Sequence, residues 1–241
     1  MIRAIGCEVL KLRRSLVLLV AATPAVMVYL LGVLAMTSGH GAGEWTVLVM
    51  SGSAIWAYFL LPMTTIGLAA LMAQTEHGPG TWSWSLALPV PRWQIFTAKI
   101  LVLLGMMALV SASVALAAFA AAWTALLIDP DLVIAGAPDW ALAFRLHGQM
   151  WIAGICVAAV QWGIAHRFRS FAAPVAIGIG GTFVAVAATS SEYGIFFPWL
   201  MPVNMLAADP ERAQIALALG GGGGALLFVL LVIWLSRRDW A

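Results

Sequence analysis

The chain has 241 residues, of which 63% are hydrophobic and 9% are charged, and its formal net charge is +2. Soluble proteins carry charge on about a quarter of their residues, and a water-soluble chain of this length could not bury so much apolar surface. The composition therefore excludes a soluble globular domain and indicates a membrane protein. The small net charge gives no indication of nucleic-acid binding.

The first fourteen residues are too polar to cross a membrane, but they are patterned. Ile2, Ile5, Val9 and Leu12 recur at three- and four-residue spacing, which places them on one helical face. We predict an amphipathic helix over residues 1–14 that lies in the membrane interface. The alternative is an ordinary positively charged flank that sets the topology. The charged residues of interest here are Glu8, Lys11, Arg13 and Arg14.

Six apolar runs follow, and each is a candidate membrane span. A helix needs about 20 apolar residues to cross the hydrocarbon core. The runs are continuously apolar rather than alternating, which predicts helices and not barrel strands. The predicted fold is a single all-α domain over residues 1–241 with six transmembrane helices. The runs cover residues 15–36, 45–73, 95–128, 150–166, 171–189 and 213–235.

The positive charges predict the orientation of these spans. If both termini are cytoplasmic, ten Lys and Arg residues lie inside and only Arg145 and Arg212 lie outside, and the opposite orientation would reverse this balance. We therefore predict a multi-pass protein with both termini in the cytoplasm. The ten inner residues are Arg3, Lys11, Arg13, Arg14, Arg92, Lys99, Arg167, Arg169, Arg237 and Arg238.

The connection between the second and third runs is the most informative loop. Residues 74–94 form its cytoplasmic part, with an apolar middle that contains Trp82 and Trp84 and with glycine and proline at its borders. Aromatic side chains are favoured as interface anchors. Glu76 and Arg92 are expected as charged partners on the rim, and Lys99 as an anchor where the third span enters the membrane. We predict that the loop docks on another protein, the alternative being a loop that lies on the inner leaflet.

Two features of the outer half complete the pattern. Residues 190–212 are rich in aromatic residues and proline, and we predict short helical pieces that re-enter the outer interface, the alternative being an aromatic anchor at the headgroups. The glycine run Gly220–Gly224 inside the sixth run indicates either close helix packing or a flexible break.

The deeper tryptophans Trp56, Trp123 and Trp162 are candidates for a substrate path or for core packing.

Several motifs of catalysis are missing from the sequence. It has no P-loop, no HExxH, no CxxC pair and no GxSxG, so we predict no catalytic residue and no metal site. The spans are almost free of ionisable residues, which argues against a proton- or ion-coupled carrier. These observations predict a membrane body without its own energy source.

The loop residues stand at fixed spacing that reads E-x3-GT-x7-P-x2-R-x6-K, and the chain starts with an E-x2-K motif formed by Glu8 and Lys11. This pattern resembles that of ABC-2 type permeases, most of all the small permeases of bacitracin-resistance and lantibiotic-immunity systems. The chain departs from the family at Pro91, where serine is common, and in the WSWS stretch at residues 82–85. The loop residues concerned are Glu76, Gly80, Thr81, Trp82, Trp84, Pro89, Arg92 and Lys99.

The resemblance implies that the loop is a coupling helix seated on a separate ABC ATPase. Two ATPase copies would power two permease chains, the second being identical or a sibling, in a bacterial inner membrane. This chain would bind no cofactor, and ATP and Mg would lie on the ATPase. Membrane lipids are also expected as partners, and nucleic acid is not. The expected cargo is an antimicrobial peptide or a lipophilic drug. The alternatives are a lipid or polysaccharide precursor, or a scaffold or sensor that recruits a soluble partner.

Overall fold

The computed structural model describes residues 1–13, 15–39, 43–87 and 89–238, and in these ranges the chain folds into helices without a β-strand. The first half contains α1 (Ile2–Leu12), α2 (Val17–Thr37), α3 (Trp45–Ile55), the π-helical turn η1 (Trp56–Leu60), α4 (Leu61–His77), α5 (Trp82–Leu86) and α6 (Arg92–Ile128). The second half contains α7 (Trp140–Ala153), α8 (Ile155–Arg167), α9 (Ala172–Ala188), the 3-10 helices η2 (Glu192–Phe196), η3 (Pro198–Leu200) and η4 (Val203–Leu206), α10 (Pro210–Leu217), the π-helical turn η5 (Ala218–Gly223) and α11 (Gly224–Arg237).

The predicted apolar runs all correspond to helices, which confirms the all-α class. Among the described residues, four helical rods are long and apolar enough to cross a membrane: α2, α3 to α4, α6, and α10 to α11. The pair α7 and α8 passes the same test with a bend of 41° between its halves. Helix α9 is apolar but has 17 residues, fewer than the ~20 that cross a bilayer. The predicted fifth span, over residues 171–189, and with it the six-span layout, therefore stays a prediction.

The fourth run differs most from its prediction. Its helix was expected to begin at residue 150, but α7 begins at Trp140, where Asp139 caps the first turn by accepting a hydrogen bond from Leu142 N. The sequence is misleading here because His147 interrupts the apolar pattern. In the structure His147 is buried and its Nδ1 lies 2.9 Å from the carbonyl oxygen of Ala143, so the helix accommodates it.

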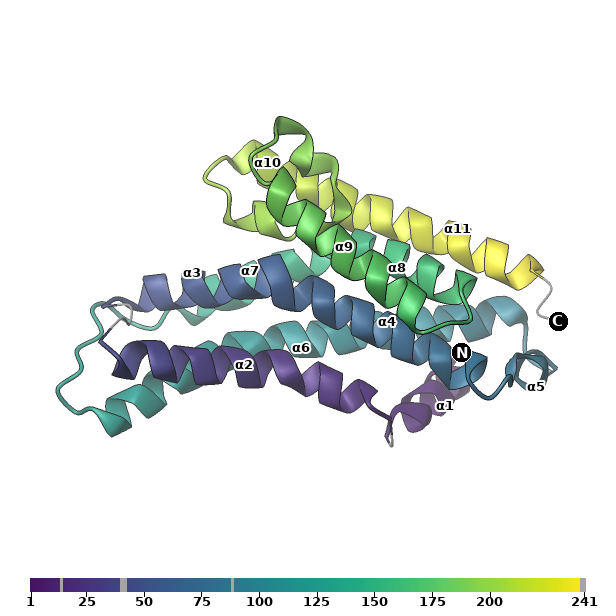
Figure 1. Cartoon of the computed structure of the whole chain (residues 1–241), viewed down its shortest axis with the longest axis horizontal. Helices are drawn as coiled ribbons and strands as arrows, with labels where there is room; N and C mark the ends of the chain where they lie inside the picture. The colour runs from purple at the N-terminus through teal and green to yellow at the C-terminus, as the bar shows by residue number, and fades with distance from the viewer. Residues whose placement is uncertain (14, 40–42, 88, 239–241) are drawn as a thin grey trace.

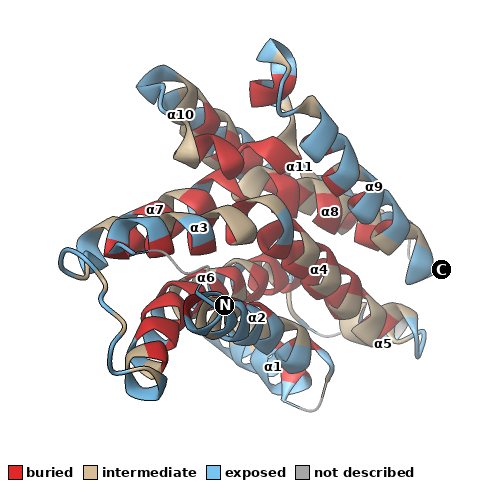
Figure 2. Ribbon diagram, turned by 60° about the vertical axis from the view of Figure 1, so that its left-hand side comes forward, coloured by how far each residue is buried: buried red, intermediate tan, exposed pale blue. Residues whose placement is uncertain are grey.

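Helix α6 is the centre of the molecule, since α1, α2, α3, α4, α7 and α11 all pack against it. Buried residues are concentrated on α4, α6 and α8, whereas α9 and the outer side of α2 are largely exposed (Figure 2). The exposed residues of α2 are mostly apolar, such as Leu19 and Leu34. A surface of this kind suits lipid contact rather than water.

The glycine run packs against the bend between α7 and α8. A Cβ added at Gly220 would lie 2.6 Å from the Ala153 Cα, and one at Gly224 would lie 2.5 Å from the Cys156 backbone nitrogen. Both positions therefore need glycine, while Gly222 has nothing within 4 Å. Close packing and a helical irregularity coexist, because the same stretch forms the π-helical turn η5.

The segment over residues 190–212 consists of the short helical pieces that its prolines predict. The 3-10 helices η2 to η4 pack on α9, α7 and α3, and the Trp199 ring lies directly over Gly181, whose missing side chain admits it. Trp199 and Met205 are buried, but Tyr193 and Phe196 are exposed. Whether the segment re-enters a membrane stays a prediction.

Most of the basic residues lie at one end of the molecule. Helix α1, helix α5 and the end of α11 lie together there, opposite the start of α3 (Figure 1). The residues predicted to lie inside are on or just beyond α1, the first turns of α6, the end of α8 and the end of α11, with Arg14 outside the described residues. Arg145 and Arg212 lie on α7 and α10 instead. The predicted orientation requires such a segregation of positive charge, and the cytoplasmic location of this end stays a prediction.

Candidate functional site

The loop after α4 folds into a short helix between two sharp chain reversals. Helix α4 ends at His77, and Gly80 has φ of +67°, a left-handed conformation that favours glycine. The Thr81 amide donates to the Glu76 carbonyl at 3.0 Å, and the Thr81 carbonyl accepts from Ser85 N to open α5. Pro91, with φ of −55°, precedes the first residue of α6. Gly80 of the motif and the neighbouring Pro91 therefore shape the backbone of the loop.

Four charged side chains of the two motifs form a closed ring. Lys11 Nζ lies 2.7 Å from Glu8 Oε1 and 2.8 Å from Glu76 Oε1. Lys99 Nζ lies 2.7 Å from Glu8 Oε2 and 2.5 Å from Glu76 Oε1. Each charge thus contacts two of the opposite sign, and the ring as a whole is neutral. It joins α1 to the end of α4 and to the start of α6.

The ring is shielded from solvent to different extents. The side chains of Glu76 and Lys99 are 2% and 1% exposed, and that of Lys11 is 37% exposed. Burial alone would lower the Lys11 pKa, but hydrogen bonds to Glu76 and Glu8 and their negative charges raise the pKa above its ordinary value. A buried charge is costly unless it is paired, so removing one member would leave the ring with one uncompensated charge. The ring therefore fixes the three elements relative to one another.

An aromatic cluster lies beneath α5 and holds it from the inside. Trp82 Nε1 donates to His77 Nδ1 at 3.0 Å, and the Trp82 ring stacks on Phe96 with centroids 5.8 Å apart. The His166 ring lies 5.8 Å from Trp82 and 4.0 Å from Trp162. Lys99 Nζ lies 5.8 Å from the Trp82 ring centre, which connects the cluster to the ring of charges. Trp82 is 5% exposed and so belongs to the core.

The outer side of α5 faces solvent. Trp84 is 80% exposed, and Pro89 and Arg92 are exposed as well. Arg92 Nη1 donates to the Arg238 carbonyl at 3.4 Å, and Arg238 Nη1 donates to the His166 carbonyl at 3.0 Å. The loop is thereby fastened to the end of α11 also. Helix α5 therefore exposes the large aromatic side chain of Trp84 on one side, while Trp82 packs against the core on the other.

The structure corrects part of the predicted surface of the loop. Glu76 was expected on an exposed rim, but it is buried because Lys11 and Lys99 pair with it inside the chain. Lys99 was expected as an interfacial anchor, and it too is buried in the ring. Arg13 is exposed beyond the end of α1, and Arg14 lies outside the described residues. A role of these residues in contacting an ATPase stays a prediction.

The candidate substrate-path tryptophans lie in separate surroundings. Trp56 and Trp162 are 1% and 0% exposed and pack in the main core. Trp123 is half exposed on α6, and its ring lies 5.8 Å from that of Trp45. Trp162 lies near the loop through its contact with His166, whereas Trp123 is close to the other end of α6, so the three do not line one common cavity. Core packing accounts for the first two, and the substrate-path role stays a prediction.

Sequence reasoning missed the histidines and Phe96. His77 and His166 looked like scattered residues at span ends, yet both are within the aromatic cluster. One signal was available for His166, because it follows Trp162 by four residues and such pairs lie on one helical face. The pairing of Glu8 with Lys99, by contrast, has no signal in residue spacing.

These features define the class of the protein: a multi-pass helical membrane protein with a rigidly held loop helix and no motif for ATP binding. The family model described as ABC-2 family transporter protein matches residues 4–185. The match includes the ring of charges, α5 and the aromatic cluster. The chain therefore belongs to the ABC-2 transporter family, whose permeases pair with an ABC ATPase. No curated protein matches the chain.

Proposed function

We propose that this chain is the permease subunit of an ATP-driven exporter and that α5 docks on a separate ATPase through Trp84. The observation that carries this proposal is the way α5 is held. Trp82 is buried against α4, α6 and α8, while Trp84 on the same short helix is 80% exposed. An exposed aromatic side chain on a fixed element is the type that anchors protein interfaces.

The contacts around α5 supply a route for force. A push on α5 would reach α4 through His77, α6 through Phe96 and α8 through His166. The ring of charges would carry the same movement to α1. Packed elements of this kind move as rigid units rather than deform gradually. Two ATPases that close on ATP would thereby switch two permease chains between inward- and outward-open arrangements.

We infer that the cargo is hydrophobic or amphipathic, in the class of antimicrobial peptides or lipophilic drugs. The spans are apolar and expose few charged groups, and the sequence motifs resemble those of bacitracin-resistance and lantibiotic-immunity permeases. Export of a lipid or polysaccharide precursor is the alternative within transport. The clustering of basic residues at the end with α5 supports a bacterial inner membrane location with both termini cytoplasmic.

Substrate-stimulated ATP hydrolysis tests this function. The permease and its ATPase would be reconstituted together in vesicles, and hydrolysis measured with and without a lipophilic peptide such as bacitracin. Stimulation that disappears in Trp84→Ala supports coupled transport. Tyr193→Ala is the matched control, because Tyr193 is 79% exposed in the connection between α9 and α10. If neither the cargo nor Trp84→Ala changes the rate of ATP hydrolysis, the scaffold or sensor function is favoured instead.

A further inference from the structure

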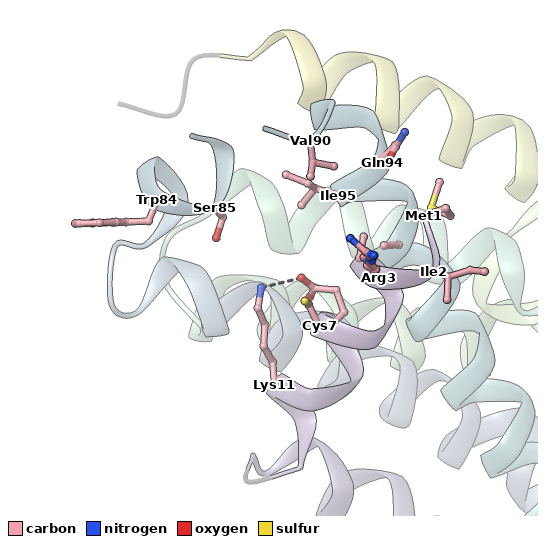
Figure 3. Close-up of a pocket in the computed structure, with 13 residues that line it drawn as sticks. Met1, Ile2, Arg3, Cys7, Lys11, Trp84, Ser85, Val90, Gln94 and Ile95 are labelled. Carbon is pink, nitrogen blue, oxygen red and sulfur yellow. Dashed lines mark hydrogen bonds and ion pairs between the residues drawn. The ribbon is translucent and has the colours of Figure 1, made fainter. Parts of the chain in front are cut away.

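A cavity at the α5 end lies between α1 and the loop. Its volume is about 900 Å³. Helix α1 contributes Arg3 and Cys7, α5 contributes Ser85, the segment before α6 contributes Val90, and α6 contributes Ile95 (Figure 3). The lining is mostly apolar, with a few polar groups at defined positions, as in sites for amphipathic ligands.

The charges around this cavity do not cancel. Glu8 and Lys11 line it, but both belong to the neutral ring, in which each carboxylate and each ammonium already has two partners. Arg3 also lines it and forms no ion pair or hydrogen bond with another described residue. The cavity therefore keeps one unbalanced guanidinium beside an apolar lining. Guanidinium groups bind phosphate well, since their donors match its oxygens.

The predicted orientation would place this cavity next to the membrane surface. Helix α1 leads into the first span through Ser15 and Leu16, and Leu16 and Leu19 are exposed apolar residues on that span. Helix α1 itself exposes Ile2 and Leu10. Such a helix lies in the headgroup region with its apolar side toward the acyl chains. Because Arg3 lies on α1, a lipid headgroup in the same region would be within reach of its side chain.

We propose that this cavity binds an anionic phospholipid of the inner leaflet, with its phosphate at Arg3 and the start of its acyl chains against Val90 and Ile95. The site rests on the proposed orientation, because anionic lipid is concentrated on the cytoplasmic leaflet. The lipid site does not depend on whether the chain transports a cargo. Bound lipid would fill the space between α1 and the loop and so stabilise the position in which α5 is presented.

Cys7 provides a probe inside the cavity, because it is one of the two cysteines of the chain and is exposed there. With Cys156→Ala, the full chain would be placed in nanodiscs of phosphatidylcholine alone or mixed with phosphatidylglycerol. The rate of alkylation of Cys7 by an uncharged maleimide would then be measured. Because one arginine near a membrane surface favours an anionic lipid by about fivefold, phosphatidylglycerol should slow alkylation by about that factor.

Two substitutions make the test specific. Arg3→Gln should remove the effect of phosphatidylglycerol, whereas Arg13→Gln should keep it, since Arg13 is an exposed arginine outside the cavity lining. Equal alkylation rates of the parent protein in the two lipids would overturn the proposal without any variant. Equal slowing in all three proteins would overturn it as well, because that indicates general accumulation of anionic lipid. Protection that appears only when purified ATPase is added would assign the cavity to a protein partner.

Discussion

The Lys99 ammonium lies 2.5 Å from Oε1 of Glu76, and both side chains are almost fully buried. These two residues flank the loop that contains α5, so their contact ties the two ends of the loop together. Glu8 and Lys11 complete the ring from α1. The charges that frame the loop in the sequence therefore act within the chain, and the part that remains free for a partner is the outer side of α5.

Substitution of Glu76 or Lys99 alone should destabilise the fold. Removing one member of a buried ion pair typically costs about 3–5 kcal/mol, and here it would leave the ring with one charge in excess and two residues with a single partner each. Glu76→Gln and Lys99→Met should each lower the unfolding midpoint in detergent. The double variant should be more stable than the sum of the single effects predicts, by about 1–3 kcal/mol.

Glu192→Gln is the control for this experiment, since Glu192 is an exposed carboxylate in the connection between α9 and α10. Its unfolding midpoint should match that of the parent protein. Strictly additive effects of Glu76→Gln and Lys99→Met would contradict the ring as a coupled unit.

The two tryptophans of α5 should behave differently. Trp82→Ala removes a buried ring and should cost about 3–5 kcal/mol. Trp84→Ala changes an exposed residue, so its stability should stay within about 0.5 kcal/mol of the parent. Thermal unfolding followed by circular dichroism measures both. A strong loss of stability in Trp84→Ala would mean that this side chain packs within the chain and is not available to a partner.

Helix α1 should depend on Glu8 for its attachment. Glu8 accepts hydrogen bonds from both Lys11 and Lys99. Hydrogen bonds to charged groups contribute about 1.5–3 kcal/mol, so Glu8→Gln should speed amide exchange in α1 by about tenfold to a hundredfold. Hydrogen–deuterium exchange by mass spectrometry would show this, with the middle of α6 as an internal reference. Unchanged exchange in α1 would mean that apolar packing alone attaches it.

Two neighbouring glycines in η5 give a matched pair. A Cβ at Gly220 would collide with the backbone of Ala153, whereas the same atom at Gly222 meets nothing within 4 Å. Gly220→Ala should therefore lower the unfolding midpoint. Gly222→Ala should leave it unchanged or raise it, since alanine is better than glycine in a helix by about 1 kcal/mol. Equal midpoints for the two variants would contradict the close packing of α10 to α11 on the bend at Gly154.

The helices could be predicted because continuous apolar runs have few ways to satisfy their backbone in lipid. The first run, over residues 15–36, became α2 (Val17–Thr37), and the third became α6 with a start three residues earlier than expected. The prediction missed the beginning of α7 because Arg145 and His147 break the apolar pattern, although the helix keeps His147 bonded to its own backbone.

The loop was identified as the candidate site from its sequence, but its internal contacts were not. Spacing rules describe neighbours on one element, such as Glu8 and Lys11 on α1. The partners Glu8 and Lys99 are separated by 91 positions and meet only when α1 packs against α6. For the same reason, Glu76 was interpreted as an exposed rim residue, since a charged residue beside a loop is exposed by default.

The most direct test of the account is capture of the ATPase by the whole chain. The tagged protein would be extracted from its native membrane in mild detergent, after crosslinking, and the proteins that accompany it identified by mass spectrometry. If α5 docks on an ATPase through Trp84, a stoichiometric ATPase with a P-loop should accompany the parent protein and Tyr193→Ala but be lost with Trp84→Ala. A clean preparation without any ATPase, or an ATPase that stays bound equally well to Trp84→Ala, would contradict docking through α5.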